Sequence, residues 1–475
     1  MKKKTLLKKI CAACFCTLFV VAASASAAAN SGPTYWEYAP SFSVTVLKDC
    51  PVTVEKENLT FDFSAPEQKK DYSPQAKVTA LYQMENPSST ALKVRMAFPL
   101  IGSLSELGGV QITANGKAIP FQTFMGDQAA GSGASQNYYK DDGTLNTKNL
   151  SFDQIIKSVN ENTAPLQKLT DTGKLYQISS GGKSCRLQVD FEIDPKKTAV
   201  LSGTGFNGFS FDKGGNGKIG LTGLLAGDVQ LPLKFLVVGD DIKNLTVGAY
   251  QEGSDTEKLP GVTPKIETSS QGTKAFINEM MQSTSEFAQQ YLSVVEKQID
   301  EKIAEGQTVI SDSILYDLCH ENHVIALVYE VPFPANGHMD VTVSYTMRGA
   351  MNTHMASQPV YSYGYLLNPA KNWAKFQNLN ITVIPPQKAP YVVNSSVALT
   401  KSGSSYVAKF PSLPQKDLVF SLYSKPQISA DDKPRSRNRD PMITILTVFA
   451  IILGVILMFR LIRKIYHKIR TRKET

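Results

Sequence analysis

The amino-acid sequence predicts a mainly β protein with two β-sandwich-like domains, one long amphipathic helix between them, and a C-terminal single transmembrane helix. Apolar and polar residues alternate with period two through residues 41–122, and again through residues 325–422. Between them, one stretch repeats its apolar residues at helical spacing, and an uncharged apolar run lies near the C-terminus. These three patterns determine the predicted fold class.

Short alternating runs fill the first of these regions. Val78 to Met84 and Leu92 to Phe98 alternate with polar partners, and the sequence ENPSS between them predicts a turn. Asn115-Gly116 separates two further runs, which is a strong hairpin signal. Residues 41–122 therefore hold about seven short strands, the number and spacing typical of a β-sandwich.

A different pattern interrupts the strands at residues 123–174, which are rich in Gly, Ser and Asn. Ser151 and Gln154 have the spacing of a capping box ahead of a short helix. Strands resume with LYQIS, CRLQVDFEI and LPLKFLVV. The sequence thus predicts an N-terminal β-rich domain over residues 30–270 with an insertion at 123–174.

The predicted helical segment covers residues 271–306. Within it, the helix itself is expected from Thr273 to Glu305, and Gly306 ends it. Its apolar residues recur at steps of three, four and seven. They are Phe276, Met280, Phe287, Tyr291, Val295, Ile299 and Ile303. This stripe favours packing within the same chain, and pairing with another helix is the alternative.

Alternating segments return after the helix, among them VIALVYEV, MDVTVSYTM and LVFSLY. They predict a second β-sandwich-like domain over residues 307–428. Residues 429–441 are polar and without periodicity, so they are expected to form a stalk.

The N-terminus has the pattern of a secretory signal peptide, predicted over residues 1–29. Five lysines precede an apolar run from Ile10 to about Ala23, and small residues follow. Cleavage could follow Ala25, Ala27 or Ala29, and the sequence does not choose among them. Cys14 and Cys16 raise a lipoprotein alternative, but most of the apolar run lies after them.

Met442 to Phe459 is an uncharged apolar run that predicts a transmembrane helix. Its 18 residues would span roughly 27 Å as a helix, close to the ~30 Å thickness of a bilayer core. Seven lysines and arginines in residues 460–475 predict a basic cytoplasmic tail that attracts anionic lipid. The expected protein is single-pass in the plasma membrane, with its bulk extracellular and membrane lipid as one partner.

Charge and cysteine usage narrow the class of protein. Without the five leader lysines and the net +6 of the tail, the overall charge of +8 becomes about −3, so no nucleic-acid partner is expected. Outside the leader only Cys50, Cys185 and Cys319 remain, enough for one disulfide at most. Low cysteine content in an exported chain is typical of a bacterial surface protein.

The densest group of metal-ligating side chains is DLCHENH, residues 317–323. His320 and His323 are three residues apart, whereas the zincin motif places its histidines four apart on one helix face. A strand is expected from Val324, so we interpret the segment as a connector and keep His320 and His323 only as weak metal candidates. GTGFNG at residues 203–208 matches a nucleotide motif, but no helix can follow it, and no cofactor is expected.

Catalytic motifs are also absent from the sequence, so no catalytic residue is assigned, and whether the protein is an enzyme stays open, with a non-enzyme favoured. Aromatic residues are the remaining candidates. Tyr361, Tyr363 and Tyr365 alternate and share one strand face, and Trp373 follows a one-turn helix that begins at Asn368-Pro369. These four rings could form a ligand platform, and the alternative is an aromatic row on a half-buried sheet.

Three segments carry a family resemblance: VEKENLTFDF, ALYQMENPSSTALKVRMAFPL and YGYLLNPAKNWAKFQNLNITV. Together they resemble poorly characterised bacterial secreted proteins with a signal peptide and a β-sandwich body, over about a quarter of the chain. The shared motifs are structural. The resemblance implies fold and export, but no activity and no functional residues.

The sequence therefore predicts a membrane-anchored cell-surface protein with a non-catalytic role in binding, adhesion or envelope organisation, acting on an extracellular ligand or protein partner of unknown identity. Two alternatives stay open. One is an envelope hydrolase whose paired carboxylates come from distant parts of the chain. The other is a subunit of a membrane sensor complex.

Overall fold

In a computed structural model, the described part of the chain runs from Ala27 to Asp432 with gaps. It comprises residues 27–36, 44–47, 49–65, 73–129, 138, 140, 145–147, 150–161, 166–203, 205–211, 217–225, 232–254, 256–284 and 291–432. The predicted span, the tail and most of the leader and stalk lie outside these residues. Within them, no helix has the length and apolar character needed to cross a membrane.

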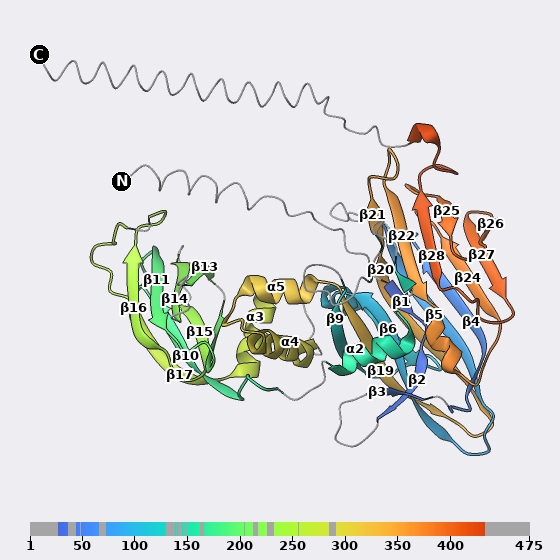
Figure 1. Ribbon diagram of the computed structural model, residues 1–475, viewed down its shortest axis with the longest axis horizontal. Coiled ribbons are helices and arrows are strands. Elements are labelled where there is room, and N and C mark those ends of the chain that lie inside the picture. The colour runs from blue at the N-terminus through green and yellow to red at the C-terminus, as the bar shows by residue number, and fades with distance from the viewer. Residues whose placement is uncertain are drawn as a thin grey trace, which may run out of the picture.

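Strands dominate the described residues, which confirms the mainly β class (Figure 1). Two large sheets face each other and form one sandwich. The ten-stranded sheet contains β1 (Ala27–Ala29), β2 (Gly32–Trp36), β3 (Val44–Val46), β6 (Leu92–Gly102), β9 (Phe121–Gln128), β19 (His323–Phe333), β21 (Ala350–Asn352), β22 (Val360–Leu366), β25 (Tyr391–Ser395) and β28 (Leu418–Tyr423). The nine-stranded sheet contains β4 (Thr53–Asp62), β5 (Gln75–Asn86), β7 (Gln111–Ala114), β8 (Lys117–Ala118), β20 (Gly337–Arg348), β23 (Lys375–Phe376), β24 (Leu379–Ile384), β26 (Thr400–Ser402) and β27 (Ser405–Phe410).

The large sandwich combines strands from both predicted domains. β19 pairs antiparallel with β6 along its whole length, β20 pairs with β5, and β24 runs parallel to β4. The strand pairing therefore differs from a division into domains 30–270 and 307–428. The physical reason is that alternation specifies which face of a strand is buried, but not which strand lies beside it.

Local signals are found where the sequence placed them. β7 and β8 form a hairpin through Asn115 and Gly116, both of which have positive φ, as a type I′ turn requires. Ala27–Ala29, the last residues of the predicted leader, form strand β1 between β22 and β6. The leader prediction and the described fold thus overlap by three residues.

A smaller lobe lies at the other end of the molecule (Figure 1). It stacks a five-stranded sheet on a four-stranded sheet. The five-stranded sheet has the order β17 (Lys265–Gly272), β10 (Thr172–Ser179), β15 (Leu233–Gly239), β12 (Thr198–Ser202) and β18 (Val309–Ile310). The four-stranded sheet has the order β13 (Phe206–Phe211), β14 (Lys218–Leu225), β11 (Cys185–Glu192) and β16 (Lys243–Tyr250). Phe235 lies between the two sheets, stacked on Tyr176 and on Phe191.

Helices α3 (Thr273–Thr284), α4 (Leu292–Ala304) and α5 (Asp312–His320) lie between the lobe and the sandwich (Figure 1). The sequence predicted one helix where α3 and α4 stand. Lys274 of α3 lies 3.6 Å from Glu296 of α4, a contact that a single continuous helix would place far out of reach. The predicted stripe is buried at Phe276 and Val295, as expected for packing within the chain.

The described residues of the predicted insertion contribute one helix and parts of two strands, β9 and β10. α2 (Phe152–Glu161) begins with the expected capping box: the amide of Gln154 donates to Ser151 Oγ, and the amide of Ser151 donates to Gln154 Oε1. Its apolar face packs on the ten-stranded sheet. Cys50, Cys185 and Cys319 are all buried as free thiols.

Candidate functional sites

The predicted tyrosine platform lies inside the large sandwich. Tyr361, Tyr363 and Tyr365 on β22 are at most 7% exposed. The Tyr363 and Tyr365 rings pack against phenylalanines of the core, and the Lys388 ammonium lies 5.1 Å from the centre of the Tyr361 ring. Tyr363 donates a hydrogen bond to the carbonyl of Pro74. In this structure the three rings are core side chains and present no face to solvent.

Trp373 is the one predicted platform residue that lines a cavity. It follows the 3-10 helix η4 (Asn368–Asn372), whose second residue is Pro369, as expected for a first helical turn. Its indole N–H donates to the carbonyl of Ser31, so the ring is held in place and only 5% exposed. The cavity has a volume of about 550 Å³, and its lining includes Lys371 and Lys375.

A buried polar cluster adjoins the tyrosine rings of β22 and consists of Glu57, Asn30, Tyr82 and Tyr365. Glu57 is fully buried, and burial raises the pKa of its carboxyl group to about 8. The Asn30 amide and the Tyr365 hydroxyl oppose this shift, yet neither Glu57 oxygen has a hydrogen-bond partner of regular geometry. Instead, the Tyr82 and Tyr365 hydroxyls both donate to Asn30 Oδ1. The cluster is closed to solvent, so we assign it no ligand.

His320 and His323 have different surroundings. His320 ends α5, where its ring stacks on Tyr316 at 3.8 Å and its Nδ1 lies 2.8 Å from the Tyr316 carbonyl oxygen. His323 begins β19, is 3% exposed, and has Nδ1 3.2 Å from the Gly126 carbonyl oxygen. Burial lowers the pKa of His323 to about 4. Among the described residues, no group of three or more histidines, cysteines and acids could hold a metal ion.

The smaller lobe carries an open cleft of about 530 Å³, called here the Lys174 cleft. β10, β15 and β17 form it together with the turns beside them. The residues that line it are Thr170, Thr172, Gly173, Lys174, Val237, Gly239, Asp241, Thr268, Ser269 and Ser270, most of which have polar side chains. Three threonines, two serines and one ion pair therefore line the same space.

The ion pair in the Lys174 cleft is held by several hydrogen bonds. Lys174 Nζ donates to Asp241 Oδ2 at 2.5 Å, and the Tyr176 hydroxyl donates to Oδ1 at 2.7 Å. The amide of Ile242 donates to the same Oδ1 at 2.9 Å. The hydrogen bond to Asp241 raises the pKa of Lys174. Partial burial alone would raise the pKa of the Asp241 carboxyl, but the hydrogen bonds from Lys174, Tyr176 and the Ile242 amide hold it below the usual value. Both side chains therefore stay charged near neutral pH.

Two glycines keep the backbone of the cleft in place. A Cβ on Gly173 would lie 2.6 Å from the carbonyl oxygen of Val237, so a side chain there would push β10 away from β15. Gly239 has φ +93°, which turns the chain from β15 toward Asp241.

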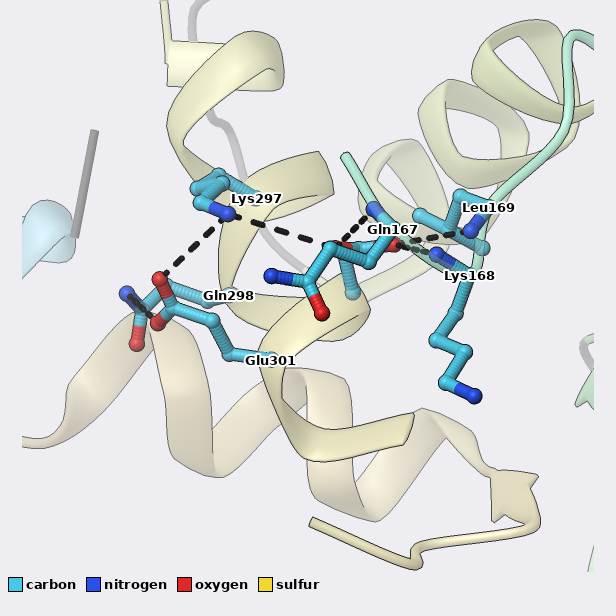
Figure 2. Close-up of polar contacts among 7 residues, drawn as sticks. Gln167, Lys168, Leu169, Lys297, Gln298 and Glu301 are labelled. Carbon is cyan, nitrogen blue, oxygen red and sulfur yellow. Dashed lines mark hydrogen bonds and ion pairs between the residues drawn. The ribbon is translucent and has the colours of Figure 1, made fainter. Parts of the chain in front are cut away.

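Asp300 of α4 anchors the chain just before the cleft, at Gln167, Lys168 and Leu169, which Figure 2 labels. Its carboxylate accepts hydrogen bonds from the amides of Gln167, Lys168 and Leu169 at 2.7–2.8 Å. The side chain is 1% exposed, and Lys297 lies 3.9 Å away on the preceding turn. Because Thr170 and β10 follow directly, this buried carboxylate positions one wall of the Lys174 cleft.

The sequence did not reveal the Lys174 cleft because its residues come from three separate stretches between Thr170 and Ser270. One signal was available. KIETSSQG, residues 265–272, has no apolar face, which is typical of a solvated edge strand. That signal indicates an exposed strand, but it does not indicate the partner strands that complete the cleft.

Comparisons with known proteins give little further information. No family model matches the chain, and no curated protein matches it. Among solved structures, it is similar to a crystal structure from Legionella pneumophila subsp. pneumophila described as a "putative nutrient binding protein". The identity is 8%, the TM-score is 0.33, and the match covers 84% of this chain and 72% of that chain. A likeness this distant supports no conclusion about function.

Proposed function

We propose that the protein is a non-catalytic binding module that takes a hydroxyl-rich polar ligand, such as a saccharide, in the Lys174 cleft. One observation carries the proposal: five Ser and Thr residues and a charged pair are among the residues that line one open cleft in the described lobe. Hydroxyls, an ammonium and a carboxylate can donate to and accept from the hydroxyls of a sugar. Such polar groups, fixed in direction, provide specificity in a ligand site.

The electrostatics of the cleft favour binding over catalysis. General acids and bases work best when their pKa values lie near the working pH. Here the pKa of Lys174 is raised and that of Asp241 is lowered, so each moves away from neutrality. Among the described lining residues Asp241 is the one carboxylate, whereas a glycoside hydrolase requires two.

The proposal includes export and anchoring at the cell surface. Its support is the N-terminal leader pattern, the apolar run Met442–Phe459, and the basic residues of 460–475. The lobe would then face the cell exterior, where saccharides are abundant, while the span and tail contact membrane lipid. Accessibility of the lobe to protease added to intact cells tests this arrangement.

A glycan array probed with the detergent-solubilised full chain tests the binding function. We expect a bound saccharide, and we expect Ser270→Trp to lower the affinity at least tenfold because the indole fills the cleft. Ser270 lies on the exposed strand β17, so the melting temperature should not change. Asp241→Ala should also weaken binding, since it removes the carboxylate that holds Lys174.

Lys218→Ala is the matched control, because Lys218 forms an exposed ion pair with Glu192 on the other sheet of the same lobe. The control should bind like the unmodified protein. Absence of saccharide binding, or equal loss in all three variants, would refute the assignment of the cleft. Release of cleaved sugar from a bound glycan would refute the non-catalytic role.

A further inference from the structure

The first described residues belong to the interior of the large sandwich. β1 pairs parallel with β22, where Ala27 is opposite Gly364, and antiparallel with β6, where Ala27 is opposite Ile101. The amide of Asn30 continues the ladder by donating to the carbonyl of Leu366 at 2.6 Å. β1 therefore lies between β22 and β6 in the strand order of the ten-stranded sheet and joins the strands on one side of it to those on the other.

The two residues after β1 are fully buried and hydrogen-bonded to both sheets. Asn30 Oδ1 accepts from the hydroxyls of Tyr82 and Tyr365 at 3.1 and 2.8 Å. Ser31 Oγ lies 2.6 Å from the hydroxyl of Tyr329, and the Ser31 carbonyl accepts from the Trp373 indole. The segment that begins at Ala27 is thus required for the core.

The three candidate leader cuts have different consequences for this segment. A cut after Ala29 removes β1 and leaves backbone groups of β22 and β6 unpaired in the middle of a sheet. It also turns the backbone amide of the buried Asn30 into an α-ammonium, and burying that charge is unfavourable. A cut after Ala27 removes the first pair of β1 and starts the chain within the strand. A cut after Ala25 preserves all of β1.

We propose that the leader is cut between Ala25 and Ser26, so that the exported chain begins at Ser26. The step is hydrolysis by a leader peptidase: water adds across the peptide bond, giving a carboxylate on Ala25 and an α-ammonium on Ser26. The peptidase cuts the chain before it folds, so the fold does not direct the cut. The chain that remains after the cut must still contain the residues that form β1. Ala23 and Ala25 supply the small residues of the cleavage pattern. This inference rests on the proposed export.

The test is expression of the full chain in a bacterial host, isolation from membranes, and mass spectrometry of the N-terminal peptide. A start at Ser26 supports the inference, and a start at Ala28 or Asn30 overturns it. An uncut chain that begins at Met1 would instead refute the proposed export by a cleaved leader. Ala25→Leu should abolish the Ser26 start, while the matched change Ala29→Leu should leave it in place.

A second measurement does not depend on the peptidase. Chains comprising residues 26–475 and 30–475 are made without the leader and compared by thermal unfolding in the same detergent. We expect the chain that begins at Asn30 to melt at least 5 °C lower, or to show no cooperative transition. Equal melting temperatures would show that β1 is dispensable and would overturn the inference.

Discussion

Single residues in this protein show why burial and sequence pattern must be considered together. The alternation of Tyr361, Tyr363 and Tyr365 correctly placed three rings on one strand face, but the pattern alone does not say what covers that face. The covering sheet comes from β4 and its neighbours: Phe61 of β4 contacts Tyr365 edge-on, and Phe63, just after β4, contacts Tyr363 edge-on. Glu57 belongs to the same inward face, in register with Leu59 and Phe61, and is therefore a carboxyl group in an aromatic core.

The buried carboxyl of Glu57 predicts a stability that falls as the pH rises. Its pKa is about 8 in the folded protein and about 4.3 in an unfolded chain. Between these values the folded state holds a proton that the unfolded state has lost. Each pH unit in that window therefore reduces the free energy of unfolding by about 1.4 kcal/mol from this group. Above pH 8 the loss is complete.

Glu57→Gln removes this ionisation, so we expect the fall in melting temperature between pH 5 and pH 8 to shrink by at least half. Thermal unfolding followed by circular dichroism across this range measures it. Glu55→Gln is the control, because Glu55 lies on the same strand with its side chain exposed beside His338. Parallel pH profiles for the Glu57 variant and the unmodified protein would contradict the prediction.

Secondary-structure elements divide into those fixed by neighbours in sequence and those fixed by distant partners. The capping box of α2 and the Asn115-Gly116 hairpin depend on residues a few positions apart, and both were predicted. The break between α3 and α4 was missed, because the apolar stripe has the same period in one helix or in two packed ones. The cleft was missed because distant partners form it: Asp241 and Ser270 line one space only after β15 and β17 pair with β10.

Asp300 gives a prediction at the level of elements, because it connects α4 to the segment that enters β10. Asp300→Ala leaves the amides of residues 167–169 without their acceptor. Hydrogen bonds to a charged group and unpaired buried donors suggest a loss of about 3 kcal/mol in the free energy of unfolding. Urea denaturation measures this loss, and weaker ligand binding in the Lys174 cleft should accompany it.

Glu305→Ala provides the comparison for Asp300. Glu305 caps the end of the same helix, its side chain is 68% exposed, and it forms an ion pair with Lys302. Its loss should change the free energy of unfolding by less than about 0.5 kcal/mol. If the two variants unfold at the same urea concentration, Asp300 does not anchor the segment.

At the scale of the whole molecule, the large sandwich is discontinuous in sequence. The chain leaves it after α2, which follows β9 and packs on the ten-stranded sheet, and returns at β19. Where β9 ends beside the start of β19, Ala129 donates to the Asn322 carbonyl and Gln128 lies opposite His323. The small lobe and helices α3 to α5 are the excursion between these two points (Figure 1). Hydrophobic residues of α3, α4 and α5 belong to the same core cluster as the sandwich, so the lobe is attached through a packed interface.

This topology predicts that residues 307–432 do not fold alone. β19 is buried along nearly all its length between β6 and β9, and β20 lies between β5 and β7, all from the first third of the chain. Without those partners, the fragment exposes two long strands with unpaired edges, which favours aggregation. Circular dichroism and size exclusion of the isolated fragment should show no cooperative unfolding and no monomer.

Co-expression with residues 27–306 should rescue the fragment, because every missing strand pair is then available in trans. A soluble one-to-one complex with the melting behaviour of the intact described chain is the expected result, and the fragment 27–306 alone should be insoluble for the same reason. If residues 307–432 instead gave a monomer with a sharp thermal transition, the C-terminal half would be an independent sandwich. The division at residues 270 and 307 that the sequence suggests would then describe the folding units better than the strand pairing does.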